Sequence, residues 1–163
     1  MRIIGIDPDV GRNGVAVVED GRLTELHSLG LAELLGWLQA FGVSAAAVVV
    51  VEAGWLNHRA SWHVSPREGA RLAAKKGHGV GRNHQRGMDI VEAARWLGCK
   101  VEELAPLRKR GHGADRKVSA ADLERLTGWT RRSNQEERDA AILALKFAEM
   151  RKKCVNLSMY GKE

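Results

Sequence analysis

Two acidic residues end strongly apolar stretches of the sequence. Asp7 ends the stretch RIIGID, directly before Pro8, and Glu52 ends the stretch AAAVVVVE. A carboxylate in such a place is costly unless a partner satisfies it. If the two stretches form parallel neighbouring strands, their carboxyl ends meet at one edge of the sheet, where ligands bind in open α/β sheets. Two carboxylates held together there favour a hard cation such as Mg²⁺ or Mn²⁺. The alternatives are a turn residue before Pro8 for Asp7 and a solvated strand end for Glu52.

A second pair of acids, Glu136 and Asp139, is spaced three positions apart on a helix predicted from Asn134 to Lys152, and therefore lies on one face of it. Glu136 is equally well explained as the third helical residue of a capping box that begins at Ser133. Asp139 directly precedes the apolar stretch AAILAL, where an unpartnered acid is a liability. Four acids from two strands and one helix could hold two divalent ions, and such a site supports in-line displacement at a phosphodiester.

The positive charge of the chain is concentrated. The whole chain has a net charge of +6 and a pI near 9.7. The segment from Trp55 to Arg86 contains seven basic residues and one acid, Glu68, so it alone carries +6. Such a segment indicates either a polyanion partner or a solvated charged surface. Together with a second basic loop over residues 107–118, the candidate nucleic-acid contacts are Arg59, Arg67, Arg71, Lys75, Lys76, Arg82, Arg86, Arg108, Lys109, Arg110, Arg116 and Lys117.

The elements that must position these side chains begin with a three-stranded antiparallel meander. Strands are predicted over residues 2–7, 14–18 and 22–29, and Asp20-Gly21 favours a tight hairpin between the last two. Apolar residues at helical spacing predict a helix over 31–41. The run of alanine and valine over 46–51 predicts a strand buried on both faces. Because it follows a helical crossover, this strand should lie parallel to a strand of the meander.

The second half of the chain alternates loops and helices. Residues 55–81 lack clear periodicity and are predicted to form a long surface segment. A helix is expected over 83–97, a short strand over 100–104, and a helix over 119–126, with Ser119 as its N-cap and Gly128 as its stop. The last helix, over 134–152, is followed by a poorly ordered tail.

Several of these segments resemble the RuvC family of Holliday-junction resolvases. IIGIDPDVGRNGVAVVEDG resembles their first hairpin, VVVVEAGW their fourth strand, and EERDAAILAL their last helix. HQRGMDIVEAARWLGCKVEELAP is similar to their helix-strand unit, and RGHGADRKVSAADLERLTG to their G-x-G-x-x-x-K loop and the helix that follows it. The likeness covers nearly the whole chain. It implies an α/β, ribonuclease-H-like fold with a five-stranded mixed sheet, order 3-2-1-4-5, flanked by helices.

The resemblance also implies roles for particular residues. Asp7, Glu52, Glu136 and Asp139 would be the metal and catalytic ligands. Lys117 would stabilise charge near the scissile phosphate. Trp55 matches an aromatic residue that wedges into the junction, although ordinary core packing explains it equally well.

Three departures from the family pattern are visible. Asp9 stands where the family usually has glycine, Glu136 replaces the more usual Asp or His, and the segment between Glu52 and Arg86 is longer than usual. Such divergence would suit a phage-type member.

The expected function is therefore structure-selective cleavage of branched DNA, in particular four-way Holliday junctions, by two Mg²⁺ or Mn²⁺ ions. Symmetric junctions favour a homodimer, formed through the helix over 83–97; a host branch-migration partner cannot be identified. An RNA-processing nuclease of the same fold (YqgF type) and a non-catalytic nucleic-acid-binding module are the alternatives.

The composition of the chain indicates its general class and the compartment in which it works. Hydrophobic residues make up 44% of the 163 residues, which is typical of a globular chain. We expect one nuclease domain over 1–153 and a tail over 154–163. The absence of a signal peptide, a membrane span or closely spaced cysteines predicts a cytoplasmic protein with Cys99 and Cys154 reduced, and no membrane partner.

Overall fold

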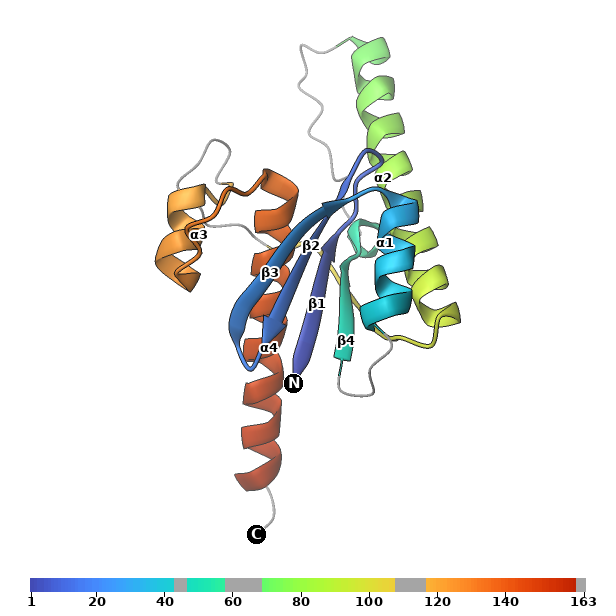
Figure 1. Cartoon of the computed structure of the whole chain (residues 1–163). Coiled ribbons are helices and arrows are strands. Elements are labelled where there is room, and N and C mark those ends of the chain that lie inside the picture. Colours follow the sequence, from blue (N-terminus) through green and yellow to red (C-terminus); the bar gives the residue numbers. More distant parts are fainter. Residues whose placement is uncertain (43–46, 58–68, 108–116, 161–163) are drawn as a thin grey trace.

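The computed structural model describes residues 1–42, 47–57, 69–107 and 117–160 of the chain. Helices cover both faces of one sheet (Figure 1). The elements, in chain order, are β1 (Arg2–Asp7), β2 (Asn13–Glu19), β3 (Arg22–Leu29), α1 (Leu31–Trp37), η1 (Leu38–Gly42), β4 (Ala47–Glu52), η2 (Gly54–Leu56), α2 (Ala70–Trp96), β5 (Lys100–Leu104), α3 (Ala120–Thr127) and α4 (Gln135–Tyr160).

The sheet has five strands in the order β3-β2-β1-β4-β5, which confirms the predicted fold class. The pairs β1–β2 and β2–β3 are antiparallel, and β1–β4 and β4–β5 are parallel. The β2–β3 turn has positive φ at both Asp20 (49°) and Gly21 (86°). That conformation matches the twist of the flanking strands, so the Asp-Gly pair closes the hairpin as predicted.

The two faces of the sheet bury different helices. On one face Ile4 and Ile6 of β1 pack with residues of α1 and α2, including Leu34 and Ile90. On the other face Ile3 packs with Leu143 and its neighbours on α4. Figure 1 shows α1 and α2 on one side of the sheet, with α3 and α4 on the other. Because successive side chains of a strand alternate between faces, the odd-numbered residues of β1 point toward α4.

Two glycines let α4 lie directly on the sheet. A Cβ on Gly5 would stand 2.4 Å from the carbonyl oxygen of Ala140, and one on Gly14 would stand 2.0 Å from that of Glu136. Gly14 pairs with Asp7 at the carboxyl end of β1. Helix α4 therefore begins over that end and runs antiparallel to β1.

Two predicted helix boundaries are wrong. Helix α2 begins at Ala70, so residues 70–81 are helical and not part of a surface loop. Only the last part of this helix is buried against the core, through Gly87, Ile90, Val91 and Ala94. Its first half extends beyond the sheet (Figure 1). Helix α4 continues to Tyr160, past the predicted end at Lys152. The rest of the predicted surface segment, residues 58–68, and most of the basic loop, residues 108–116, lie outside the described residues.

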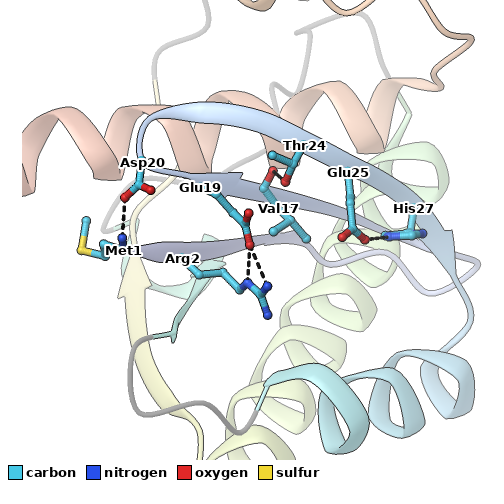
Figure 2. A network of polar contacts seen from close by, with 8 residues as sticks. All are labelled: Met1, Arg2, Val17, Glu19, Asp20, Thr24, Glu25 and His27. Carbon is cyan, nitrogen blue, oxygen red and sulfur yellow. Dashed lines mark hydrogen bonds and ion pairs between the residues drawn. The ribbon is translucent and has the colours of Figure 1, made fainter.

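Ion pairs close the amino-terminal end of β1, opposite Asp7. The N-terminal ammonium donates to Asp20 Oδ1 over 2.6 Å and Arg2 pairs with Glu19 over 2.7 Å (Figure 2). The bond from the ammonium holds the pKa of Asp20 below its usual value. Exposed pairs of this kind contribute little to stability.

No helix in the described ranges is long and apolar enough to cross a membrane.

Candidate active site at the carboxyl edge of the sheet

Asp7 and Glu52 end adjacent parallel strands. Ile6 pairs with Val51 in the β1–β4 ladder, so the residues that follow, Asp7 and Glu52, are neighbours at the carboxyl edge. Val50 packs toward α4 and Val51 toward α2, which by strand alternation assigns Glu52 to the α4 face, the same face as Asp7. Both residues therefore leave the sheet from one edge and toward one side.

Both carboxylate residues border the same cavity, of about 320 Å³. Its walls come from the β1–β2 loop, from η2, from α2 and from the segment after β5. The lining residues are Asp7, Pro8, Glu52, Gly54, Trp55, Asn57, Val80, Asn83, His84 and Pro106.

Helix α4 approaches this edge with its amino terminus. Leu143 packs on Ile3, Val48 and Val50, so the face of α4 that carries it lies over β1 and β4. Asp139 lies one helical turn before Leu143, on the same face and nearer the carboxyl edge. It is 6% exposed, and one of its oxygens accepts a hydrogen bond from Gln135 Nε2 over 2.9 Å. The positive end of the helix dipole points toward the same edge and favours negative charge there.

The cap of α4 differs from the predicted one. Asn134 Oδ1 accepts from the backbone N–H of Glu137 over 2.8 Å, and Glu137 Oε2 accepts from the N–H of Asn134 over 2.6 Å. The capping box therefore runs from Asn134 to Glu137, one residue later than the predicted box of Ser133 and Glu136. Glu136 is therefore not the capping residue of α4, which was the alternative to its predicted role as a metal ligand.

The structure brings the four predicted metal ligands together only in part. Within the described part of the chain, no group of three or more His, Cys, Asp or Glu side chains is arranged to hold a metal ion. The cavity receives Asp7 and Glu52, whereas Glu136 and Asp139 do not line it. Two carboxylates side by side at the end of buried strands still fit a hard divalent cation, because they supply oxygen donors and a negative charge that needs compensation. The roles of all four acids as ligands stay predictions.

Trp55 is anchored as a packing residue. Its indole Nε1 donates to Glu103 Oε2 over 3.1 Å, and a Cβ on Gly87 would stand 2.4 Å from its ring carbon Cζ3. The half-buried ring also packs against the core on the α2 side. These contacts confirm the packing interpretation; the wedge role stays a prediction.

His84 makes the reciprocal contact. A Cβ on Gly54 would stand 2.5 Å from His84 Nε2, and the His84 ring meets that of Trp55 edge-on at 6.5 Å. One side chain from η2 therefore fills a glycine gap on α2, and one from α2 fills a glycine gap on η2. This interlock fixes α2 relative to the end of β4. Sequence reasoning missed His84, whose signal was its place three residues after Gly81, the last residue of a glycine-rich stretch.

The β1–β2 loop is clamped onto α2 by a residue that sequence reasoning also missed. Asn83 Oδ1 accepts from the N–H of Val10 and its Nδ2 donates to Asp9 Oδ2, each over 3.2 Å. Asp9 Oδ1 also accepts from the N–H of Gly11 over 2.8 Å. Asp9, which departs from the family pattern, therefore organises the loop that follows Asp7.

The other end of that loop is tied to α1. Arg12 pairs with Glu33 over 3.0 Å, and Glu33 also accepts from the N–H of Gly30 over 2.7 Å. The Gly30 hydrogen bond, followed by the charge of Arg12, lowers the pKa of Glu33. The β1–β2 loop is thus fixed to α2 at one end and to α1 at the other.

The predicted basic residues lie in two places. Arg71, Lys75, Lys76, Arg82 and Arg86 are on α2, beyond or beside the cavity wall, and Arg86 also donates to the carbonyl of Val10 over 3.5 Å. Lys117 is exposed just before α3. The remaining predicted contacts, Arg59, Arg67, Arg108, Lys109, Arg110 and Arg116, lie outside the described residues.

The arrangement of sheet and helices defines a RuvC-like fold of the ribonuclease-H type. The chain is similar to the RuvC structure of Thermus thermophilus in complex with a Holliday junction substrate, at 22% sequence identity and a TM-score of 0.55, over 92% of this chain and 96% of that one. It is also similar to a structure of Thermus thermophilus RuvC at 21% identity and a TM-score of 0.54, with the same coverage. No protein-family model and no curated protein matches the chain. At this identity the likeness establishes the fold.

Proposed function

We propose that this protein is a divalent-metal-dependent endonuclease that cleaves branched DNA, with four-way junctions as its preferred substrate. The observation that carries the proposal is the pair Asp7 and Glu52, which end adjacent parallel strands and border one cavity. The structural likeness to RuvC in complex with a Holliday junction supports the same substrate class.

The proposed chemistry assigns roles to the acids around the edge. Asp7 and Glu52 would hold Mg²⁺ or Mn²⁺, with Asp139 and Glu136 at the start of α4 completing the set for two ions. When bound, such ions polarise a phosphate and lower the pKa of bound water. The chain itself contributes the loop after Asp7, which Asn83 fixes through Asp9 and Val10, and Lys117, which would lie near the scissile phosphate to stabilise charge.

The basic half of α2 supports a nucleic-acid substrate. Arg71, Lys75 and Arg82 are exposed on a helix that leaves the body of the protein and has no acid in its first turn. Basic side chains of this kind bind phosphates and release counterions. The interlock of Trp55 and His84 fixes this basic arm relative to the carboxylate edge, so both would engage one substrate.

A homodimer would place two such edges on one junction. Near its end, α2 exposes Met88 (41%) and Trp96 (85%), the latter almost completely. Large exposed apolar side chains on one helix favour a protein interface. Paired symmetric cuts call for twofold symmetry, which supports a dimer through this helix.

The test is cleavage of labelled four-way DNA junctions, linear duplex and structured RNA, each with Mg²⁺ or Mn²⁺. We expect junction cleavage by the parent, its loss in Glu52→Gln, and full activity in Glu124→Gln, a matched change at an exposed glutamate of α3. Preferential cleavage of RNA would identify the RNA-processing alternative. Binding without metal-dependent cleavage of any substrate, unchanged in Asp7→Asn, would identify a non-catalytic binding module.

A further inference from the structure

The turn between α3 and α4 carries positive charge that the proposed function has not used. Arg131 and Arg132 are exposed and adjacent, and neither forms an ion pair or a side-chain hydrogen bond with any described residue. Nearby Arg125, by contrast, pairs with the buried carboxylate of Asp122 over 2.8 Å. Within the described part of the chain, Arg131 and Arg132 are thus unpaired cations at a fixed place in the fold.

Arg131 is held in place by an aromatic ring. Its guanidinium carbon lies 4.0 Å from the centre of the Trp129 ring, within the range of a cation–π contact. Trp129 packs against the core beside α3, and its buried Nε1 has no hydrogen-bond partner among the described residues. Leaving an indole N–H without a partner costs free energy. Stacking leaves the guanidinium N–H groups at the rim available to a planar acceptor such as phosphate.

A single side chain brings this turn next to Lys117. Arg138 of α4 donates through Nε to the carbonyl of Val118 over 2.9 Å and through Nη1 to that of Ser133 over 2.6 Å. Val118 follows Lys117, and Ser133 follows Arg132. The guanidinium of Arg138 therefore fastens both segments to the first turn of α4.

The same turn of α4 lies on the carboxylate edge. Glu136 rests on Gly14, which pairs with Asp7. The cations of the α3–α4 turn consequently border that edge from the α4 side of the sheet, whereas the basic arm of α2 borders it from the other side.

We infer that Arg131, Arg132 and Lys117 form a second phosphate-binding surface, which holds the nucleic-acid backbone on the α4 side of the carboxylate edge. This inference rests on the proposed function for its ligand. It adds a contact on the side of the sheet opposite α2, so that one substrate is gripped on both sides of the site. Arginine is suited to this role because its planar donors match the oxygens of a phosphodiester.

The experiment measures DNA affinity as a function of salt by fluorescence anisotropy, in EDTA so that cleavage cannot interfere. The full-length parent is compared with the double variant Arg131→Ala/Arg132→Ala. A control, Arg151→Ala/Lys153→Ala, removes two exposed charges farther along α4, about 24 Å from its first residue at about 1.5 Å per residue. A charge-preserving variant, Arg131→Lys/Arg132→Lys, tests whether charge or packing matters.

Loss of two phosphate contacts should reduce the slope of log affinity against log salt by about 1.8. Between 50 and 200 mM NaCl, the parent should then lose about 12-fold more affinity than the double alanine variant. The control and the lysine variant should keep the slope of the parent. A double alanine slope equal to that of the control, or a lysine variant whose slope falls as far as that of the alanine variant, would overturn the inference. A lysine variant that keeps the slope of the parent but binds more weakly would support it, because lysine keeps the charge and loses the planar donors.

The two proposals fail in different ways. If the parent binds DNA with the expected salt dependence but cleaves nothing, the nuclease proposal falls and the binding surface stands. If the parent cleaves junctions while the double alanine variant binds like the control, the surface falls and the nuclease proposal stands. A parent that binds neither DNA nor RNA would overturn both.

Discussion

Replacing Gly14 by alanine tests whether α4 is seated on the carboxyl edge. The new Cβ would lie 2.0 Å from the carbonyl oxygen of Glu136 and 2.7 Å from the backbone nitrogen of Glu137. Ordinary contact begins near 3.4 Å, so the first turn of α4 must retreat by about 1.4 Å, because backbone atoms cannot rotate away as a side chain can. Overpacking of this kind costs about 1–3 kcal/mol.

The expected result has two parts. For a chain of this size, each kcal/mol lowers the melting temperature by about 2–4 °C, so we expect a fall of about 2–12 °C. Because a displacement near 1 Å can reduce a rate by about 10²-fold, junction cleavage should fall by a similar factor if α4 supplies site residues. Thermal unfolding by circular dichroism and single-turnover cleavage measure the two effects.

Gly36→Ala is the matched control. Gly36 is exposed in α1, and a Cβ there would meet nothing within 4 Å, so alanine should be neutral or stabilising by up to about 1 kcal/mol. A Gly14→Ala protein as stable and as active as the parent would refute the placement of α4 against β2.

Three further predictions concern the elements around the site. Asn134→Ala should lower the free energy of unfolding by about 1 kcal/mol, because it removes the cap of α4. Ser133→Ala should change that free energy by less than about 0.5 kcal/mol. Equal effects of the two variants in urea unfolding would contradict the observed capping box. Gly87→Ala should destabilise the protein by about 1–3 kcal/mol, because the new Cβ clashes with the aromatic ring of Trp55 on η2. Gly81→Ala has open space around its Cβ and should stabilise the protein by up to about 1 kcal/mol. Calorimetry that ranks the two variants the other way would refute the interlock of α2 and η2. Burial raises the pKa of the Cys99 thiol, so at pH 8 a smaller fraction of it is thiolate than in the unfolded chain. Alkylation of Cys99, followed by peptide mapping, should therefore be slower in the native protein than in urea. Equal rates would contradict its burial.

The sheet could be predicted because its signals are local and strong. Asp20-Gly21 defines a hairpin, and the uninterrupted valine run before Glu52 identifies a central strand. The crossover rule then leaves few topologies. The pairing of Asp7 with Glu52 at one edge follows from the same reasoning.

The start of α2 could not be predicted, because its first half buries no apolar face. Glycines at 77, 79 and 81 lower the helix propensity, and the first buried residue is Gly87. Periodicity detects only helices that pack against a core. The charge of the basic residues at 71–86 makes them candidate contacts, but no local signal indicates that they line a helix.

The sequence does not predict which residue caps α4, because two neighbouring residues suit that position equally well. Ser133 and Asn134 are both good caps, and each has a glutamate three residues later, so the sequence offers two capping boxes. Asn83 and His84 reach the cavity only because two glycines admit close packing of α2 on η2. Contacts between residues that are distant in the chain leave no periodic signal.

The most direct test of the central claim is diffraction from crystals soaked in Mn²⁺, recorded where the ion scatters anomalously. The account predicts an anomalous peak within coordination distance of the carboxylates of both Asp7 and Glu52, and its loss in Glu52→Gln. No peak at that edge, or peaks only at other carboxylates, would contradict it.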